Sequence, residues 1–374
     1  MVGQGSGKGK ERMADKKRHT SSRKLDHLRI CAEEDIECGD AGFGDIRIVH
    51  NALPECDMGN IDLSTRFLSH RLSSPLFISA MTGGHPYTKE ANARLARIAE
   101  GFGIGMGVGS QRAALEDPQL ADTFSVVRDE APHAFLVANL GAVQLRDHGI
   151  AWAEGAVEMI GADALAIHLN FLQEAIQPEG DHNAAGCLSA IQELCAGIKT
   201  PVIVKETGCG ISAETARKCW GAGVSAIDTG GWGGTSWAAV ESVRAGTSKR
   251  KEDRHLISLG ADLTGWGIPT AVSLAEVLST GSPVIASGGI RSGLDIAKSL
   301  ALGADLCGMA LPLVKPALTS DEALTERVEA IHRELTAAMF LSGAARISDL
   351  RKARLYVTGK TRQMIGRDDP GRFR

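Results

Sequence analysis

The amino-acid sequence predicts an α/β barrel in which eight parallel strands alternate with helices. Eight short apolar runs recur after residue 73, and each is followed by a turn with Gly or Asn and then by an Ala-rich amphipathic stretch. Most of these runs lie roughly 30 residues apart, which is the length of a strand–helix unit. A chain of 374 residues can hold one such barrel, since a barrel typically needs about 250 residues.

The eight apolar runs have the length and the flanking turn residues of buried strands. They lie at residues 75–80, 104–108, 135–138, 164–167, 202–204, 225–227, 283–286 and 306–309. An open, doubly wound sheet is the alternative, but it usually has fewer units and an early dinucleotide-binding glycine motif. The alternate glycines at 103–109 lack the helix-opening spacing of that motif, so the closed barrel is favoured.

The chain divides into four parts around this barrel. Residues 1–22 are rich in Gly, Ser, Lys and Arg without an apolar run, so we expect a disordered basic extension. Residues 23–72 lead into the barrel at 73–355, and residues 356–374 form a C-terminal tail. The charged segment 248–254 separates the sixth and seventh runs and is expected to be an exposed insertion or a mobile lid.

Composition argues against several classes of protein. The formal net charge of -4 gives no electrostatic basis for binding nucleic acid, and no stretch is long and apolar enough to cross a membrane. The eight cysteines are scattered without a Cys-x-x-Cys pair, which disfavours a zinc site and favours a reducing compartment. We therefore predict a cytoplasmic enzyme that acts on a small molecule.

Alternation along the strands predicts where polar side chains gather. In the fourth run Leu165 and Ile167 would face the helices, which turns His168 inward, and the same rule turns Lys205 inward in the fifth. Active sites of such barrels are built at the carboxyl ends of the strands. The side chains expected to converge at this rim are Asn139, His168, Asn170, Lys205 and Asp228.

Three glycine-rich loops follow adjacent strands and predict a phosphate site. They are 230–236, 287–293 and 308–310, after the sixth, seventh and eighth runs. Glycines let the backbone approach an anion, and N–H groups at a helix N-terminus face it. Thr235 and Ser236 are also placed to cap a helix that begins near Trp237. Glycines in tight turns are the alternative, but three such loops side by side favour a bound phosphate.

Two of three charged residues near the rim, Lys205 and Glu174, are open to more than one interpretation. Lys205 would form a Schiff base or stand as a cation beside a cofactor, or else pair with Glu206 or Asp228 in the core. Glu174 would hold a Mg²⁺ ion that bridges phosphate oxygens, or simply cap the next helix. Arg112 would present a guanidinium group to the rim.

Taken together, the motifs resemble one family, the FMN-dependent type 2 isopentenyl-diphosphate isomerases. The order and number of the matching stretches make the resemblance specific from about residue 23 to residue 350. They are 23–27 (RKLDH), 74–84 (SPLFISAMTGG), 107–112 (GVGSQR), 138–142 (ANLGA), 168–170 (HLN), 172–174 (LQE), 177–181 (QPEGD), 204–208 (VKETG), 233–237 (GGTSW), 266–270 (WGIPT) and 287–293 (SGGIRSG).

The resemblance implies individual roles for some of the matching residues. FMN would be held by Ala80, Met81, Thr82, Ser110, Asn139, Lys205 and Thr235, with its phosphate at Gly289, Ile290, Arg291, Ala310 and Leu311. The substrate diphosphate, held by residues of the segment 23–72 and of the barrel, would meet Arg23, Lys24, Ser110, Gln111 and Arg112. Asn170 would line the substrate pocket, Glu174 would bind Mg²⁺, and the catalytic group would comprise His168, Gln173 and Lys205.

The chain departs from the family pattern at two positions. Phe171 stands where the family usually has proline, which would fix the backbone ahead of Gln173 and Glu174. Gly230 stands where a small Ser or Ala is expected, in a loop near the flavin.

The reaction that the resemblance implies is the interconversion of isopentenyl and dimethylallyl diphosphate in isoprenoid biosynthesis. FMN, Mg²⁺ and NADPH as the reductant of FMN would be its cofactors, and the enzyme would be a homo-oligomer, a tetramer or larger. The alternative is an FMN-dependent hydroxy-acid oxidase or dehydrogenase. That enzyme needs a histidine base after strand six or seven, and no histidine occupies a comparable position here.

Overall fold

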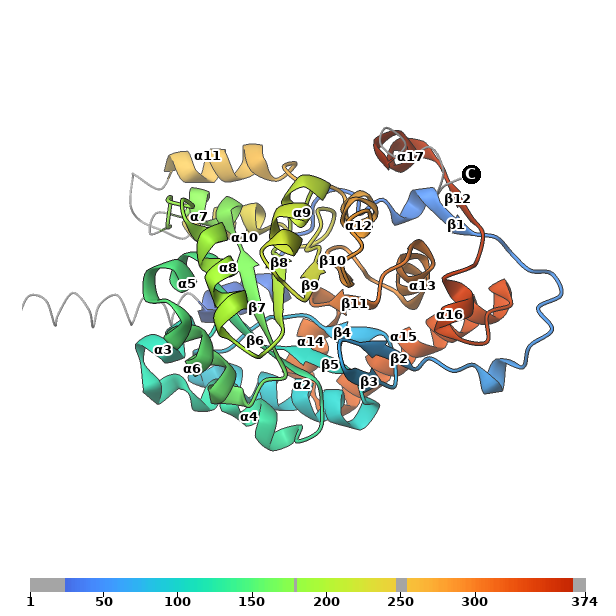
Figure 1. The fold of residues 1–374 in the computed structure, drawn as a ribbon, viewed down its shortest axis with the longest axis horizontal. Helices are drawn as coiled ribbons and strands as arrows, with labels where there is room; N and C mark the ends of the chain where they lie inside the picture. The colour runs from blue at the N-terminus through green and yellow to red at the C-terminus, as the bar shows by residue number, and fades with distance from the viewer. Residues whose placement is uncertain (1–23, 178–179, 247–253, 366–374) are drawn as a thin grey trace, which may run out of the picture.

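The computed structural model describes residues 24–177, 180–246 and 254–365. The extension at 1–22, Arg23 and most of the charged segment at 248–254 lie outside the described residues. Eight parallel strands close into a barrel, which confirms the predicted fold class (Figure 1). Neighbouring strands follow one another in chain order, and each overlaps its predicted run: β4 (Leu76–Ile78), β5 (Gly105–Gly107), β6 (Leu136–Gly141), β7 (Ala164–Leu169), β8 (Val202–Glu206), β9 (Ala226–Asp228), β10 (Val284–Ser287) and β11 (Leu306–Met309).

A ring of helices surrounds the barrel, because each strand is followed by at least one helix whose apolar face packs on the strands. Consecutive members of the ring contact each other, and the last, α15, returns to the first, α2. The ring consists of α2 (Lys89–Phe102), α4 (Asp122–Glu130), α6 (Ile150–Ile160), α8 (Cys187–Gly197), α9 (Ala213–Gly221), α12 (Thr270–Leu278), α13 (Gly293–Leu302) and α15 (Asp321–Ser342).

The remaining helices are mostly short and lie in the loops. They are η1 (Phe43–Asp45), η2 (Met58–Asn60), η3 (Pro86–Thr88), α3 (Arg112–Glu116), η4 (Pro118–Leu120), α5 (Ala142–His148), α7 (Phe171–Ile176), α10 (Trp237–Gly246), α11 (Arg254–Leu263), α14 (Leu311–Thr319), α16 (Ile347–Leu350) and α17 (Gly359–Ile365). Residues 24–33 are also helical. No helix in the described part of the chain has the length and apolar character of a membrane span.

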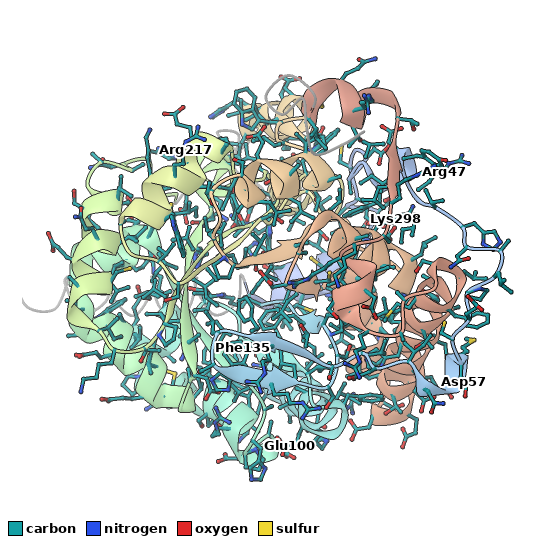
Figure 2. All side chains as sticks on the ribbon, turned by 45° about the vertical axis from the view of Figure 1, so that its right-hand side comes forward. Arg47, Asp57, Glu100, Phe135, Arg217 and Lys298 are labelled. Carbon is teal, nitrogen blue, oxygen red and sulfur yellow. The ribbon has the colours of Figure 1, made fainter. Side chains whose placement is uncertain are left out.

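Alternation along the strands separates two hydrophobic layers, as predicted. Leu165, Ile167 and Val204 pack between the strands and the helices, whereas Ala166 and Ile203 lie in the barrel interior. Figure 2 labels Phe135 within the body of the molecule and the exposed residues Arg47, Asp57 and Arg217 near its perimeter. The barrel is therefore a packed core, and polar chemistry is confined to its ends.

A hairpin that was not predicted closes the amino end of the barrel. It consists of β2 (Thr65–Phe67) and β3 (His70–Leu72), which pair antiparallel. Phe67 joins the interior cluster, and its ring lies edge-on to that of Phe135, with 5.9 Å between the ring centroids. Because Phe135 precedes β6, the hairpin covers the amino ends of the strands and leaves the carboxyl ends for a binding site.

A two-stranded clasp ties the segments before and after the barrel together. β1 (Ile46–Ile48) pairs antiparallel with β12 (Leu355–Val357), so the residues expected as a tail from 356 onward lie partly in β12 and α17. Asp45 accepts a hydrogen bond from the backbone N–H of Thr361 at 3.0 Å. The segment before β1 crosses the loop after β9, where the N–H of Cys38 donates to the carbonyl of Gly234 at 3.0 Å.

Candidate active site

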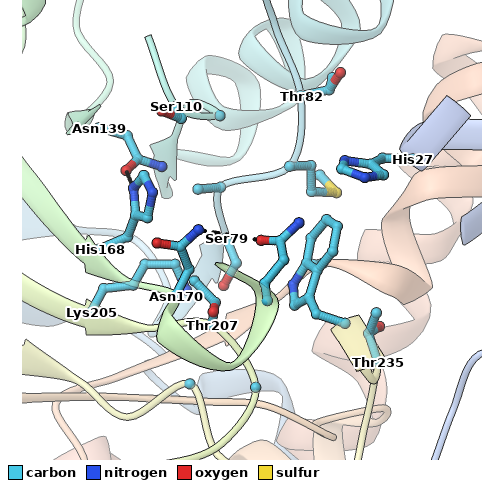
Figure 3. Close-up of a pocket in the computed structure, with 18 of the residues that line it drawn as sticks. His27, Ser79, Thr82, Ser110, Asn139, His168, Asn170, Lys205, Thr207 and Thr235 are labelled. Atoms are coloured by element: carbon cyan, nitrogen blue, oxygen red, sulfur yellow. Dashed lines mark hydrogen bonds between the residues drawn. The ribbon is translucent and has the colours of Figure 1, made fainter. Parts of the chain in front are cut away.

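A large cavity lies at the carboxyl ends of the barrel strands, where polar residues were predicted to converge (Figure 3). About 1560 Å³ of space lies between its lining atoms, part of it open to solvent. The predicted residues that line it are Lys24, Ala80, Met81, Thr82, Ser110, Arg112, Asn139, His168, Asn170, Gln173, Glu174, Lys205, Thr235, Gly289, Arg291, Ala310 and Leu311.

Two other residues to which the resemblance gave a role, Gln111 and Ile290, do not present a side chain to the cavity. Gln111 is fully buried, donates to the carbonyl of Ala156 at 2.8 Å and accepts from the N–H of Asn139 at 2.9 Å. Its side-chain amide thus holds strand β6 and α6 together and is turned away from the cavity. The side chain of Ile290 belongs to the core, which leaves only its backbone for a ligand, and Arg23 lies outside the described residues.

The loops after β10 and β11 form a cradle of unpaired backbone donors. The N–H groups of Gly289, Ile290, Ala310 and Leu311 donate to no acceptor within the described residues. Leu311 begins α14, and unpaired N–H groups at a helix N-terminus and in a glycine-rich loop beside a cavity are typical places for an anion. The residues present therefore fit the phosphate group of FMN, and they would hold it mainly through the backbone.

The cradle needs glycine at a position where the backbone takes a left-handed conformation. Gly289 has φ 65°, and a Cβ atom there would overlap the carbonyl group of Gly233. The same holds at Gly230, whose φ is 45° and whose Cβ would overlap the carbonyl of Glu206. This contact gives a local reason for glycine at 230, where the family pattern has Ser or Ala.

The Arg291 side chain turns toward the segment that covers the cradle. Its Nε and Nη2 atoms lie 2.6 and 2.5 Å from the carboxylate of Glu37, and its Nη1 donates to the carbonyl of Ile290 at 3.0 Å. In this arrangement the guanidinium group fastens the N-terminal segment over the phosphate loops. Arg291 thus joins the cradle to its cover.

His168 is held as a neutral ring with a defined tautomer. The Asn139 amide group donates to the carbonyl of Val108, so its oxygen is the acceptor for His168 Nδ1–H at 2.8 Å (Figure 3). Burial, together with the cations Lys24, Lys205 and Arg112, lowers the pKa of His168 from 6.5 to about 3. The ring therefore keeps an unprotonated Nε2 at neutral pH.

The helix α7 places an amide and a carboxylate beside the cavity. Phe171 is its first residue, a position that also suits proline, so the family departure leaves the helix start unchanged. Glu174 accepts hydrogen bonds from the Asn170 amide and from the N–H of Asp181, both at 2.8 Å. Within the described residues, no lysine or arginine forms an ion pair with Glu174, so its negative charge remains available to a cation.

A buried carboxylate that was not predicted connects the N-terminal helix to α7. Glu241 of α10 accepts from the Gln173 amide at 2.9 Å and lies 2.9 Å from His27 Nε2 and 2.6 Å from Arg244 Nε. Burial acts to raise the pKa of Glu241, but His27 and Arg244 outweigh it and lower the value to about 2. Glu241 is thus a fixed anion that orients Gln173.

Comparison with known proteins decides between the enzyme classes that this geometry allows. A family profile described as FMN-dependent dehydrogenase matches residues 17–119 and 151–357. Proteins named isopentenyl-diphosphate delta-isomerase are similar over nearly their whole length. The protein from Methanoregula boonei is 77% identical and covers 95% of this chain and 99% of its own, and that from Methanosarcina mazei is 53% identical over 92% and 94%.

This chain belongs to the isopentenyl-diphosphate delta-isomerase family. A third member, from Archaeoglobus fulgidus, is 51% identical over 92% of this chain and 98% of its own. The FMN-dependent dehydrogenase profile places the family among flavoproteins, which agrees with the backbone cradle for a phosphate. The resemblance inferred from the motifs is therefore confirmed.

Solved structures share the isomerase family's barrel at low sequence identity. A mandelate oxidase mutant carrying an FMN adduct superposes with a TM-score of 0.60 at 17% identity and covers 89% of this chain and 92% of its own. A lactate oxidase from Pediococcus acidilactici gives a TM-score of 0.62 at 17% identity, covering 89% and 87%. At such identities the likeness concerns the fold alone.

Several residues that line the isomerase cavity were given no individual role by the sequence. They are His27, Leu28, Cys31, Ser79, Gln144, Thr207, Trp237 and Ser287. Ser79 and Ser287 could have been found, because each ends or follows a barrel strand, as the predicted residues do. His27 and Trp237 lie on helices, where the ring centroids approach to 5.1 Å, and nothing in the local pattern signals that contact.

Proposed function

We propose that this chain interconverts isopentenyl diphosphate and dimethylallyl diphosphate, with FMN, Mg²⁺ and NADPH as cofactors. The observation that carries the proposal is one cavity with two places for anions in a member of the isomerase family. The backbone cradle at Gly289 and Ala310 suits the FMN phosphate. Lys24, Arg112 and Glu174 line another part of the same cavity. The two cations suit a diphosphate, and the carboxylate suits the metal ion that accompanies it.

The residues around Glu174 fit a magnesium ion that the substrate helps to bind. Mg²⁺ commonly takes one or two carboxylates together with substrate phosphates rather than a cage of protein ligands. Glu174 faces the cavity without a cationic partner in the described ranges, and the described residues contain no group of three or more His, Cys, Asp or Glu that would form a cage. We infer that Glu174 and the diphosphate share the ion.

In the proposed reaction the protein binds, orients and encloses the substrate. Lys24, Arg112 and Ser110 hold the diphosphate end, and Trp237 and Met81 offer apolar surface to the five-carbon unit. Reduced FMN, when bound, would supply a group that carries a proton to and from the allylic carbons. The neutral His168 and the Glu241-oriented Gln173 amide would then position the reacting end.

Lys205 would stand beside the flavin ring as a fixed cation. Its Nζ donates to the carbonyl of Glu206 at 2.9 Å and lies 3.7 Å from the carboxylate of Asp228. A cation at that place stabilises negative charge on a reduced flavin. Lys205 can therefore pair with Asp228 and still stand beside the cofactor, so the two interpretations of this lysine do not exclude each other.

The proposal also covers the cellular compartment and the oligomeric state of the protein. All eight cysteines are free thiols, which supports a reducing compartment and hence the cytoplasm. We also infer a homo-oligomer, a tetramer or larger, and light scattering of the purified protein would measure its size. The net charge of -4 supports a small-molecule partner rather than nucleic acid.

The decisive experiment is an isomerase assay in D₂O with FMN, Mg²⁺ and either NADPH or dithionite under anaerobic conditions. We expect product that carries deuterium, a requirement for reduction, and no stoichiometric use of the reductant. Full activity of flavin-free protein in air would overturn the proposal. Oxidation of lactate or mandelate with reduction of the bound flavin would instead support a hydroxy-acid oxidase.

A further inference from the structure

Strands β8 and β9 bring a lysine and an aspartate together at the floor of the cavity. Lys205 and Asp228 are direct partners in the strand register, and both point inward. The Nζ atom of Lys205 lies 3.7 Å from Oδ2 of Asp228, and the two side chains are 13% and 3% exposed. Lys205 lines the large cavity whereas Asp228 does not, so the carboxylate lies behind the lysine.

The Asp228 carboxylate is held in place by neutral donors. Its Oδ1 atom accepts hydrogen bonds from the hydroxyl of Ser287 and from the N–H of Gly230 at 3.3 Å. Within the described residues, Lys205 is the one cation that pairs with Asp228. The position of the carboxylate is therefore fixed by β10 and the loop after β9, independently of Lys205.

The pair stands between the cofactor cavity and an apolar interior. The pair also lines a small second cavity, whose lining residues are Phe77, Ala80, Gly107, Val108, Val137, Ala138, Asn139, Ala166, Ile203, Lys205, Asp228 and Ile285. Apart from Asn139 and the pair itself, these side chains offer no polar group. Charges in such surroundings are weakly screened, so each affects its neighbours strongly.

We propose that Asp228 is the counter-ion that positions Lys205 and sets how much positive charge Lys205 presents to the cofactor. The inference rests on the proposed function, in which Lys205 stands beside the flavin ring. A cation there stabilises the reduced, anionic flavin, and a carboxylate 3.7 Å from that cation offsets part of its field. Asp228 is thus a positioning residue that tunes the flavin through Lys205.

The first test is the balance between oxidised and reduced FMN on the holoenzyme. Asp228→Asn keeps an oxygen for Ser287 and Gly230 but removes the charge. We expect reduced FMN to be favoured about tenfold over oxidised FMN relative to the wild type, a rise of about 30 mV in midpoint potential. Lys205→Met should shift the potential the opposite way, and Asp305→Asn, which removes the carboxylate partner of Arg351 away from the site, should leave it unchanged.

The second test is made without flavin, so its result can be interpreted even if one of the variants binds FMN poorly. Lys205→Met leaves a buried carboxylate without its cation, which destabilises a protein more than removing both charges does. In thermal melts of the apoprotein, the double variant Lys205→Met/Asp228→Asn should therefore be more stable than Lys205→Met alone. A double variant whose loss of stability equals the sum of the two single losses would show that the residues are not paired.

The outcomes separate this inference from the proposed function. Wild-type protein that fails to bind FMN or to isomerise the substrate would overturn the proposed function first. If the wild type binds FMN and is active, an Asp228→Asn variant with an unchanged or lowered midpoint potential would overturn the counter-ion proposal alone. Ser287→Ala, which loosens the carboxylate without removing its charge, should give a smaller shift than Asp228→Asn.

Discussion

His168 donates its Nδ1 proton to the side-chain oxygen of Asn139 across 2.8 Å, and both residues are buried. The bond fixes the ring on the inner face of β7 with an unprotonated Nε2. Because the pKa of His168 is lowered from 6.5 to about 3 by burial and the nearby cations, the folded protein resists protonation of this ring. One measurable property that follows is how the stability of the protein depends on pH.

We predict that His168 makes the protein lose stability in mild acid. The unfolded histidine takes up a proton below about pH 6.5, whereas the folded one does not until about pH 3, so stability falls with pH across that window. Between pH 7 and pH 5 the contribution amounts to about 2 kcal/mol. Urea unfolding of His168→Gln should show a shallower pH dependence than the wild type, and His50→Gln, at an exposed site, should not. Equal slopes for all three proteins would contradict the buried, neutral ring.

We predict that Glu174→Gln raises the Mg²⁺ concentration needed for half-maximal activity at least tenfold. The substitution keeps the size of the side chain and an oxygen for Asn170 but removes the charge that attracts the ion. FMN binding should change little, because the phosphate cradle is built from other loops. Glu193→Gln, an exposed change on α8, is the matched control. Unaltered metal dependence in Glu174→Gln would make Glu174 a helix-capping residue.

Arg112→Ala should chiefly raise KM for the diphosphate substrate. Loss of one charge-assisted contact with an anion costs about 1.5–3 kcal/mol, or roughly 10- to 150-fold. Arg112 now shares a 2.9 Å ion pair with Glu116 within α3. Glu116→Gln would release the guanidinium group, so its KM should stay equal to the wild-type value or fall. If Arg112→Ala leaves KM unchanged, the diphosphate is bound elsewhere.

Gly289→Ala should weaken FMN binding without unfolding the barrel. Residue 289 adopts φ 65°, and the added Cβ would overlap the carbonyl group of Gly233, so the loop must shift away from the phosphate. Backbone strain of this kind costs about 1–3 kcal/mol, or roughly 5- to 150-fold in affinity. Fluorescence quenching during FMN titration measures the effect. Gly101→Ala, in α2 with open space around it, should bind FMN as the wild type does.

Glu241→Gln should lower kcat more than it raises KM. Glu241 accepts a hydrogen bond from the Gln173 amide at 2.9 Å. A glutamine at 241 has only one acceptor oxygen, and its amide NH₂ would face donors such as Gln173, so at least one of these hydrogen bonds would be lost. We expect a loss of at least tenfold in kcat with FMN binding retained. Ser242→Ala, at the next position of α10, serves as the control because its hydroxyl bonds to Ile257 of α11 instead. An unchanged kcat in Glu241→Gln would remove Gln173 from the reacting end.

The barrel and most of the cavity wall follow from local sequence rules. Apolar runs followed by turn residues predict the buried strands. The alternation of side chains along each strand then places His168 and Lys205 on the inner face of the barrel. The glycine-rich loops can also be predicted, because the glycines themselves allow the backbone conformations of these loops. Ser236 also caps α10 as expected, with the N–H of Ala239 donating to its hydroxyl at 3.3 Å.

What escaped prediction depends on contacts between distant parts of the chain. The strands of the hairpin at Thr65–Leu72 are three residues long, too short for a periodic signal, and their burial exists only because the barrel end receives Phe67. The burial of Glu241 cannot be predicted from the local sequence either, since a glutamate on a helix is normally solvated. Its burial depends on His27 and Gln173, which arrive from other elements. The direction of the Gln111 side chain has no local signal for a related reason, because it is set by contacts with α6 and β6.

The pairing of β1 with β12 has a consequence for how the protein is made. The segment that lies over the phosphate loops is anchored through Asp45 to Thr358 and Thr361, which leave the ribosome after every barrel strand. During synthesis the finished barrel loops can therefore hold this segment first, through Glu37 and Cys38, and its second anchor through Asp45 forms last.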